Sequence, residues 1–161
     1  MKVVINRKFG GFGISDLAAI EYCKRNNNGN VYIYADFIFV KGEDYKSSAY
    51  DYEKLAKVDE EFVRNINKYQ PLKCVDFYYS MIDYGDVVMK RVVLDSSMAF
   101  RRTTDFRRTD PTLISVVEDL GEQASCSYSK LVVVEIPDDV DWYIEDYDGM
   151  ESIHERHRIW Q

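Results

Sequence analysis

Positively charged side chains gather immediately ahead of the clearest helix start in the chain. Asp110 and Pro111 open a segment that continues to residue 120, and four arginines precede it: Arg101, Arg102, Arg107 and Arg108. Asp110 can cap a helix through its carboxylate, and proline is tolerated at the first helical position. A guanidinium group fits phosphate or carboxylate, and the free N–H groups of a helix start favour the same ligands. The pattern favours an anionic ligand. The alternative is that these arginines neutralise acidic neighbours within the fold or at a subunit interface.

A glycine-rich loop near the amino terminus is the second candidate. Phe9-Gly10-Gly11-Phe12-Gly13 follows a β-branched run over 1–6 and precedes Ser15, which predicts a strand, a loop and a helix over 16–25. Such loops often hold phosphates. Asp16 stands where the Rossmann pattern needs its third glycine, and the chain has no GK[ST] for a P-loop. The alternative is a turn that lets two phenylalanines pack.

The last residues hold both histidines, His154 and His157, three positions apart, with Glu151 one turn earlier. We predict a short terminal helix or arm over 150–160, on which these side chains share a face. The spacing is not HExxH and no third histidine exists, so we expect no metal site. Arg158 and Trp160 would instead hold a phosphate and a base. Alternatively, His157 and Arg158 offset the acidic run over 138–148.

No arrangement of a nucleophile and a base is readable, which favours a binding protein over an enzyme, without a cofactor. Glu118 and Glu122 are spaced as magnesium ligands on a helix, as in helical nucleotide pyrophosphohydrolases, but one such pair falls short of the four carboxylates needed. A metal-dependent nucleotide hydrolase is therefore a second alternative. It would use four residues: Glu118, Glu122, Glu151 and His154.

Composition narrows the class of protein. The chain has 161 residues, a net charge of −7, thirteen tyrosines and three widely spaced cysteines, which is typical of one domain with reduced thiols. The net charge argues against broad nucleic-acid binding. We find no signal peptide and no apolar run long enough for a membrane span, and therefore expect a cytoplasmic protein with no membrane partner.

The segments that must position these residues alternate between strand and helix periodicity along the chain. We predict strands over 1–6, 31–40, 73–82, 87–94, 130–136 and 141–145, and helices over 16–25, 51–68, 111–120 and 150–160. Asp83–Asp86 would join two of the strands as a hairpin turn. This order predicts an α+β fold in a single domain, 1–161, with a mixed or antiparallel sheet and three to four helices.

Three segments resemble a family of small, mostly uncharacterised bacteriophage proteins. They are MKVVINRKFGGFGIS at the start, RTDPTLISVVEDLGEQAS in the third quarter, and VVEIPDDVDWYIEDYDGMESIHERHRIW at the end. The glycine–phenylalanine loop, the R-x-D-P helix start and the closing YDG…E…HR.W occur in this order in that family. The resemblance implies a phage protein acting in the host cytoplasm, with a family-variable insertion at about 41–100.

The chain is also similar in kind to phage proteins that sequester cyclic nucleotide signals of the Thoeris and CBASS defence systems. This similarity implies a homo-oligomer that binds a cyclic nucleotide without cleaving it. The expected ligand-binding residues are Asn6, Arg7, Phe9, Gly10, Gly11, Phe12, Arg107, Arg108, Asp110, His157, Arg158 and Trp160. The first alternative is an inhibitor that binds a host protein through the acidic run over 138–148.

Overall fold

The computed structural model describes residues 1–39, 54–66 and 72–156 of the chain. These residues form an α+β fold with four α-helices and antiparallel strand pairing, as the sequence predicted. The chain divides into two compact units. Both ends of the chain, Met1–Tyr22 and Thr103–Gln161, form unit 1, and the segment Cys23–Arg102 between them forms unit 2.

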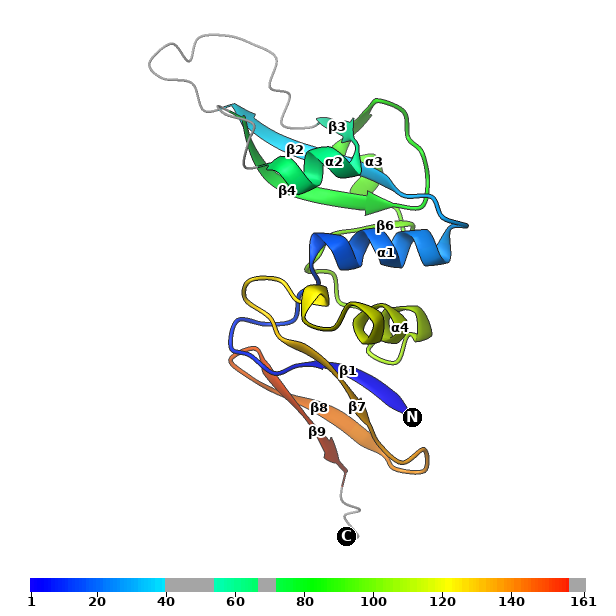
Figure 1. Ribbon diagram of the computed structural model, residues 1–161, viewed down its shortest axis with the longest axis vertical. Coiled ribbons are helices and arrows are strands. Elements are labelled where there is room, and N and C mark those ends of the chain that lie inside the picture. Colours follow the sequence, from blue (N-terminus) through cyan, green and yellow to red (C-terminus); the bar gives the residue numbers. More distant parts are fainter. Residues whose placement is uncertain (40–53, 67–71, 157–161) are drawn as a thin grey trace. The chain divides into compact units, whose positions relative to one another are not determined.

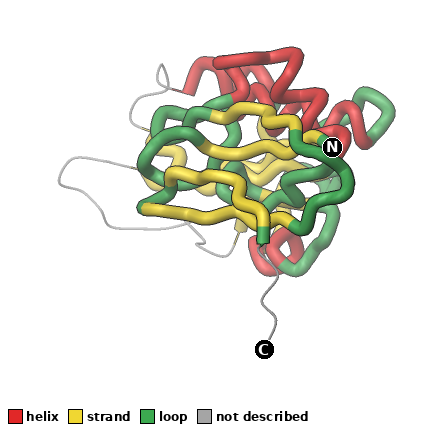
Figure 2. Tube along the Cα trace, turned by 90° about the horizontal axis from the view of Figure 1, so that it is seen from below, coloured by secondary structure: helices red, strands yellow, loops and turns green. Residues whose placement is uncertain are grey.

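Unit 1 is built from two antiparallel strand pairs and a helix (Figure 1). β1 (Lys2–Asn6) pairs with β7 (Leu131–Glu135), so that Lys2 lies opposite Glu135 and Asn6 opposite Leu131. β8 (Trp142–Tyr147) and β9 (Met150–Glu155) form a hairpin. Figure 2 draws these strands in yellow. α4 (Pro111–Leu120) contacts both β1 and β7, and a 3-10 turn, Gly121–Ala124, follows it.

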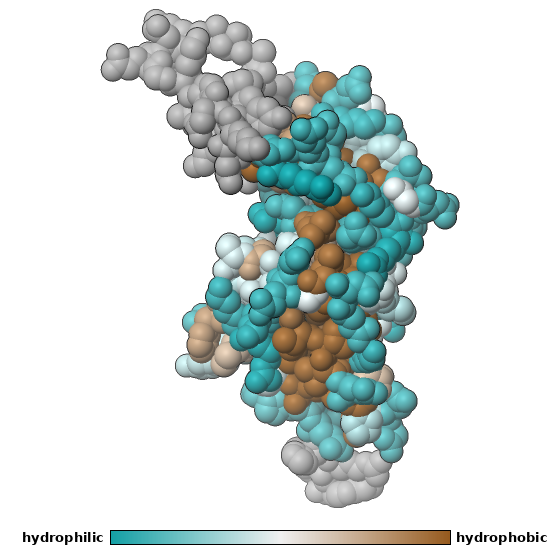
Figure 3. Space-filling model, viewed as in Figure 1, coloured by the Kyte–Doolittle hydropathy of each residue, from teal (hydrophilic) through white to brown (hydrophobic). Residues whose placement is uncertain are grey.

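The core of unit 1 lies around β1, whose residues 3–6 are buried on both faces. The apolar stripe of α4, formed by Leu113, Val116 and Val117, is buried as well. β7 is less covered, and its valines at 132–134 are half-buried. Figure 3 shows apolar surface in the region where Figure 1 draws β7. Buried and exposed residues therefore do not alternate along β1, because both faces of the strand are covered.

Unit 2 holds a five-stranded antiparallel sheet in the order β5-β3-β2-β4-β6. The strands are β2 (Tyr32–Phe39), β3 (Lys54–Val58), β4 (Leu72–Ser80), β5 (Val87–Met89) and β6 (Ala99–Phe100). Two short helices, α2 (Glu60–Asn65) and α3 (Lys90–Leu94), belong to it, and α1 (Asp16–Asn26) runs from unit 1 into unit 2. The buried apolar cluster of unit 2 consists of Tyr34, Leu55, Tyr78, Val88 and Val93.

Several predicted elements are confirmed with small shifts of their ends. The predicted strands over 1–6, 31–40 and 130–136 correspond to β1, β2 and β7, while Val40 lies outside the described residues. Ser15 Oγ accepts the Ala18 N–H at 3.0 Å at the start of α1. Gly121 ends α4 with a φ of 55°, a backbone conformation that favours glycine.

The predicted helix over 51–68 is wrong in its first half. Lys54–Val58 forms β3 and pairs with β2, and a helix begins only at Glu60 (residues 51–53 and 67–68 lie outside the described residues). Asp59 caps this helix by accepting the Phe62 N–H at 2.7 Å. Lys57 pairs with Asp83 at 2.7 Å. Pairing with a neighbouring strand has overridden local helix propensity.

Two further predictions are corrected. Residues 83–86 do not join a hairpin, because β5 pairs with β3, and α3 takes the rest of the predicted strand over 87–94. Residues 150–155 are strand β9 and not a helix, because Asp148 and Gly149 both have positive φ and turn the chain back on β8. Among the described residues, no helix is long and apolar enough to cross a membrane.

Candidate functional site

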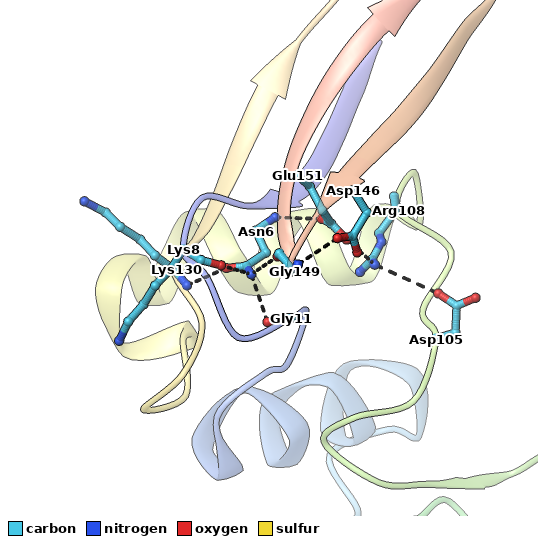
Figure 4. Close-up of polar contacts among 9 residues, drawn as sticks. All are labelled: Asn6, Lys8, Gly11, Asp105, Arg108, Lys130, Asp146, Gly149 and Glu151. Atoms are coloured by element: carbon cyan, nitrogen blue, oxygen red, sulfur yellow. Dashed lines mark hydrogen bonds and ion pairs between the residues drawn. The ribbon is translucent and has the colours of Figure 1, made fainter.

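The side chain of Asn6 ties the glycine loop of unit 1 to its neighbours (Figure 4). Its Nδ2 donates to three carbonyl oxygens: Lys8 O at 2.6 Å, Gly11 O at 2.9 Å and Gly149 O at 2.6 Å. Its Oδ1 accepts the Lys130 N–H at 2.7 Å. Asn6 is fully buried, so no atom of its amide remains for the ligand contact that the sequence suggested.

The glycines of this loop permit close backbone contacts. A Cβ added at Gly149 would lie 2.0 Å from Gly11 N, and one added at Gly10 would lie 2.7 Å from Tyr128 O. Gly10 and Gly11 also have positive φ, which disfavours any side chain. Gly10 donates its N–H to Asp148 O at 3.2 Å. The loop is therefore built as a packing junction between β1 and the β8–β9 turn, and its glycines have a structural use independent of any phosphate.

Arg108 is held inside this junction. Its Nη2 donates to Glu151 Oε1 at 2.8 Å, and its Cζ lies 3.3 Å from the centroid of the Phe12 ring. Glu151 Oε2 accepts the Asn6 N–H at 2.8 Å. The side chains of Arg108 and Glu151 are only 14% and 4% exposed, so the ion pair is largely removed from water. Arg108 Nη1 is buried with no hydrogen-bond partner among the described residues.

Burial dominates the electrostatics of this pair. It raises the pKa of Glu151 above its ordinary value, although the Asn6 N–H and the Arg108 charge act in the opposite direction. Burial likewise lowers the pKa of the Arg108 guanidinium, against the attraction of Glu151. Desolvation of two charges can exceed their mutual attraction. The pair therefore has a structural role. Glu151 neutralises Arg108, which the sequence analysis predicted to bind a ligand.

The start of α4 is also occupied. Asp110 Oδ1 accepts the N–H groups of Thr112 at 2.7 Å and Leu113 at 3.3 Å, and its Oδ2 accepts the Tyr22 hydroxyl at 2.7 Å. The predicted cap is thus confirmed. A carboxylate already sits where an incoming phosphate would sit. Arg107 remains exposed, with its Nε donating to Thr109 Oγ1 at 3.2 Å.

The arginines at 101 and 102 belong to unit 2, whereas Arg107 and Arg108 belong to unit 1. Arg101 pairs with Asp76 at 3.3 Å and its Cζ lies 6.0 Å from the centroid of the Tyr78 ring. The four arginines are therefore divided between different partners.

A second group of cations lies where the β1–β7 ladder ends, and we call Arg7, Lys8 and Lys130 the basic ridge. The Arg7 N–H donates to Lys130 O at 2.8 Å, which continues the register one residue beyond Asn6 and Leu131 and places Arg7 opposite Lys130. All three ridge residues are exposed. Among the described residues, no carboxylate lies within ion-pair distance of their side chains, and Lys8 Nζ donates to Ser127 O at 2.6 Å. Figure 4 shows Lys8 and Lys130 extending to the same side of Asn6.

The opposite end of the same ladder differs in charge. There Lys2 lies opposite Glu135, and Lys2 Nζ also donates to Glu118 at 2.6 Å. Opposite charges across a ladder stabilise a strand pair and like charges destabilise it. Phe9, adjacent to the basic ridge in sequence, is 54% exposed. The basic ridge, which has no carboxylate partner among the described residues, is therefore followed in the chain by an exposed aromatic ring.

The β8–β9 hairpin concentrates the negative charge. Residues 131–155 contain nine carboxylates and neither lysine nor arginine, more negative charge than the net −7 of the whole chain. Strand pairing places Tyr143, Glu145 and Tyr147 on one face together with His154. His154 Nε2 contacts both Ser152 Oγ at 2.8 Å and Glu145 Oε2 at 3.0 Å. Because both partners meet the same nitrogen, this group lacks the relay geometry of a hydrolase triad.

The hydrolase alternative finds no assembled site in the described part of the chain, where no three His, Cys, Asp or Glu side chains gather as metal ligands. Glu118 pairs with Lys2, Glu151 pairs with Arg108, and His154 points to the other face of β9 from Glu151. His157, Arg158 and Trp160, expected at the ligand, lie outside the described residues.

Sequence reasoning missed Lys8 and Lys130. No local pattern singles out Lys130, because its relation to Arg7 exists only once β1 and β7 pair. The partner of Arg108 was missed for the same reason, although Glu151 stood in a segment already considered for metal binding. No protein-family model, curated protein or solved structure matches this chain.

Proposed function

We propose that this is a non-enzymatic binding protein whose β8–β9 hairpin docks on a positively charged surface of a partner protein. The observation that supports it is the charge of residues 131–155, which hold nine carboxylates and neither lysine nor arginine. Glu151 pairs with Arg108 and Glu135 lies opposite Lys2, and the other seven carboxylates are exposed. A surface of one sign steers an oppositely charged partner and disfavours partners of like charge.

The outer face of the hairpin adds aromatic area to this charge. Tyr147 is 74% exposed and Tyr143 is 37% exposed. The guanidinium carbon of Arg156 lies 5.8 Å from the centroid of the Tyr143 ring, so this face already holds one arginine by a cation–π contact. Tyrosine beside carboxylate suits an arginine of a partner, because the ring meets the guanidinium plane and the carboxylate meets its N–H groups.

This function corresponds to the inhibitor of a host protein that the sequence offered as an alternative. We favour it because Arg108, one of the arginines expected to hold a nucleotide, pairs with Glu151, and because Asp110 occupies the start of α4. A phage origin and action in the host cytoplasm belong to the same proposal, on the resemblance of the two chain ends.

The test compares two variants that change the net charge equally. The hairpin variant carries Glu145→Gln, Asp148→Asn and Glu155→Gln. The control carries Glu61→Gln, Asp95→Asn and Glu122→Gln, which are exposed residues elsewhere. Asparagine tolerates the positive φ of Asp148. The probe is a purified arginine-rich peptide, with binding measured by calorimetry at about 50 mM and about 500 mM salt.

We expect the hairpin variant to bind at least about tenfold more weakly at low salt, the control to bind as the wild type does, and salt to abolish the difference. Equal weakening in both variants would mean that only net charge matters, and the proposed docking surface would be wrong. A lysine-rich peptide of equal length should bind more weakly than the arginine-rich one, since it lacks the planar group.

A further inference from the structure

We propose that the basic ridge and Phe9 form a second, separate binding site, which takes a small nucleotide. In this arrangement the phosphates lie on Arg7, Lys8 and Lys130, and the base lies against the Phe9 ring. This site shares no residue with the hairpin surface. Two of its residues, Arg7 and Phe9, were among the ligand-binding residues predicted from the sequence. It replaces the arginines at the α4 start with Lys8 and Lys130.

The charge of the ridge is the first support. Arg7 lies opposite Lys130 across the last rung of the ladder, and Lys8 follows directly. Like charges in this position destabilise a strand pair, and no carboxylate of the described residues offsets them. The chain as a whole has a surplus of carboxylates, with 28 acidic against 21 basic residues, yet none of the described carboxylates pairs with the ridge. A bound phosphate would supply the missing negative charge.

The backbone beneath the ridge is fixed before any ligand arrives. The Asn6 side chain holds Lys130 N, Lys8 O and Gly11 O, and the Arg7 N–H is held by Lys130 O. Asn6 is itself fully buried. Because these bonds set the positions from which the three side chains leave the backbone, little backbone order has to be gained on binding.

Phe9 supplies the specificity for a nucleotide over a simple anion. Its ring is 54% exposed, and Phe9 directly follows Arg7 and Lys8 in the chain. Aromatic rings stack on any base, and cations around such a ring bind the attached phosphates. No histidine or carboxylate of the described residues contacts the ridge side chains, so we expect the bound nucleotide to stay intact.

The experiment measures binding of four probes, ATP, cyclic di-AMP, inorganic tripolyphosphate and oligo-dT, by calorimetry in the presence of EDTA. The test variants are Arg7→Gln with Lys130→Gln, and separately Phe9→Ala. The control is Arg91→Gln, an exposed cation of α3 in unit 2. Thermal unfolding of each variant shows that the fold is kept.

We expect at least one nucleotide to bind, and the double variant to bind that nucleotide and tripolyphosphate at least about tenfold more weakly. Phe9→Ala should weaken nucleotide binding but leave tripolyphosphate unchanged, and Arg91→Gln should change neither. The site is wrong if no probe binds, or if a probe binds equally well to the folded double variant. Tighter binding of oligo-dT than of any nucleotide would overturn the small-ligand assignment in favour of single-stranded nucleic acid.

Chromatography of the ligand released by heat then tests whether it stays intact. Recovery of the unchanged nucleotide is expected. Recovery of a cleaved nucleotide would overturn the assignment of a non-catalytic site. Binding of the arginine-rich peptide should be unaffected by the ridge variants, so the failure of one proposed surface would leave the other proposal intact.

Discussion

Arg108 and Glu151, 43 residues apart in the chain, form an ion pair of 2.8 Å beneath the ring of Phe12. The glutamate also accepts the Asn6 N–H, so a single carboxylate connects the segment before α4 to β1 and β9. Such a pair is expensive to break from one side, because the remaining charge is left buried without its partner.

Arg108→Met should lower the free energy of unfolding by about 3 kcal/mol, since it leaves the Glu151 carboxylate uncompensated. Arg107→Met, at the exposed neighbour, should change it by less than about 0.5 kcal/mol. Urea unfolding followed by circular dichroism measures both. Equal effects in the two variants would show that the Arg108–Glu151 pair has no special role.

The raised pKa of Glu151 predicts a specific pH dependence. A carboxyl whose pKa is higher in the folded than in the unfolded state stabilises the protein below its ordinary value of 4.5 and loses this contribution as pH rises through the folded pKa. Glutamine resembles the protonated form and does not titrate. Relative to Glu151→Gln, the wild type should therefore lose stability as pH rises above 4.5. Unfolding of both proteins across this range tests the sign, and a relative gain by the wild type would refute it.

Asn6→Ala should be among the most damaging single substitutions in unit 1. It leaves three carbonyl oxygens and the Lys130 N–H without the bonds that the Asn6 amide makes. Unsatisfied buried groups cost about 1–3 kcal/mol each, so we expect a loss of about 3 kcal/mol or more. The matched control is Asn30→Ala, at an exposed asparagine whose amide makes one long bond of 3.3 Å to Asn27 O. The two thermal unfolding midpoints should differ clearly.

Lys130→Gln should stabilise the free protein. The substitution removes the like charge opposite Arg7, which is worth about 0.2–1 kcal/mol across a strand pair. Lys2→Gln, at the other end of the ladder, should destabilise it because Lys2 faces Glu135. Both effects should shrink as salt is added. A gain in stability together with a loss of nucleotide binding would mark Lys130 as a residue kept for its ligand.

Cys23 should be inert to thiol reagents in the folded protein. It is fully buried in α1, and burial raises the pKa of its thiol to about 12, so almost no thiolate exists at neutral pH. Cys126 is half-buried and should react before Cys23. Peptide mass spectrometry after timed alkylation measures both rates. Rapid labelling of Cys23 without denaturant would show that α1 opens readily.

Local chemistry explains which parts of the fold were predictable from the sequence. Asp110, Pro111 and Gly121 specify the start and end of α4 through interactions within a few residues, and the helix lies where they place it. The β-branched and aromatic runs of β1 and β2 have strong strand propensity. Where propensity was weak, as at Lys54–Val58 and Met150–Glu155, pairing with β2 and β8 decided the outcome.

The residue pattern alone predicts the α+β class, the capped helix α4 and the residue types available for an anion or an acidic surface. Which charges have partners depends on how the chain folds back on itself. In the folded chain Arg108 pairs with Glu151, Asp110 caps the start of α4, and Arg7 lies opposite Lys130. The physical reason is distance along the chain: Asn6, Arg108, Lys130 and Glu151 meet only through strand pairing and burial, which no local pattern encodes.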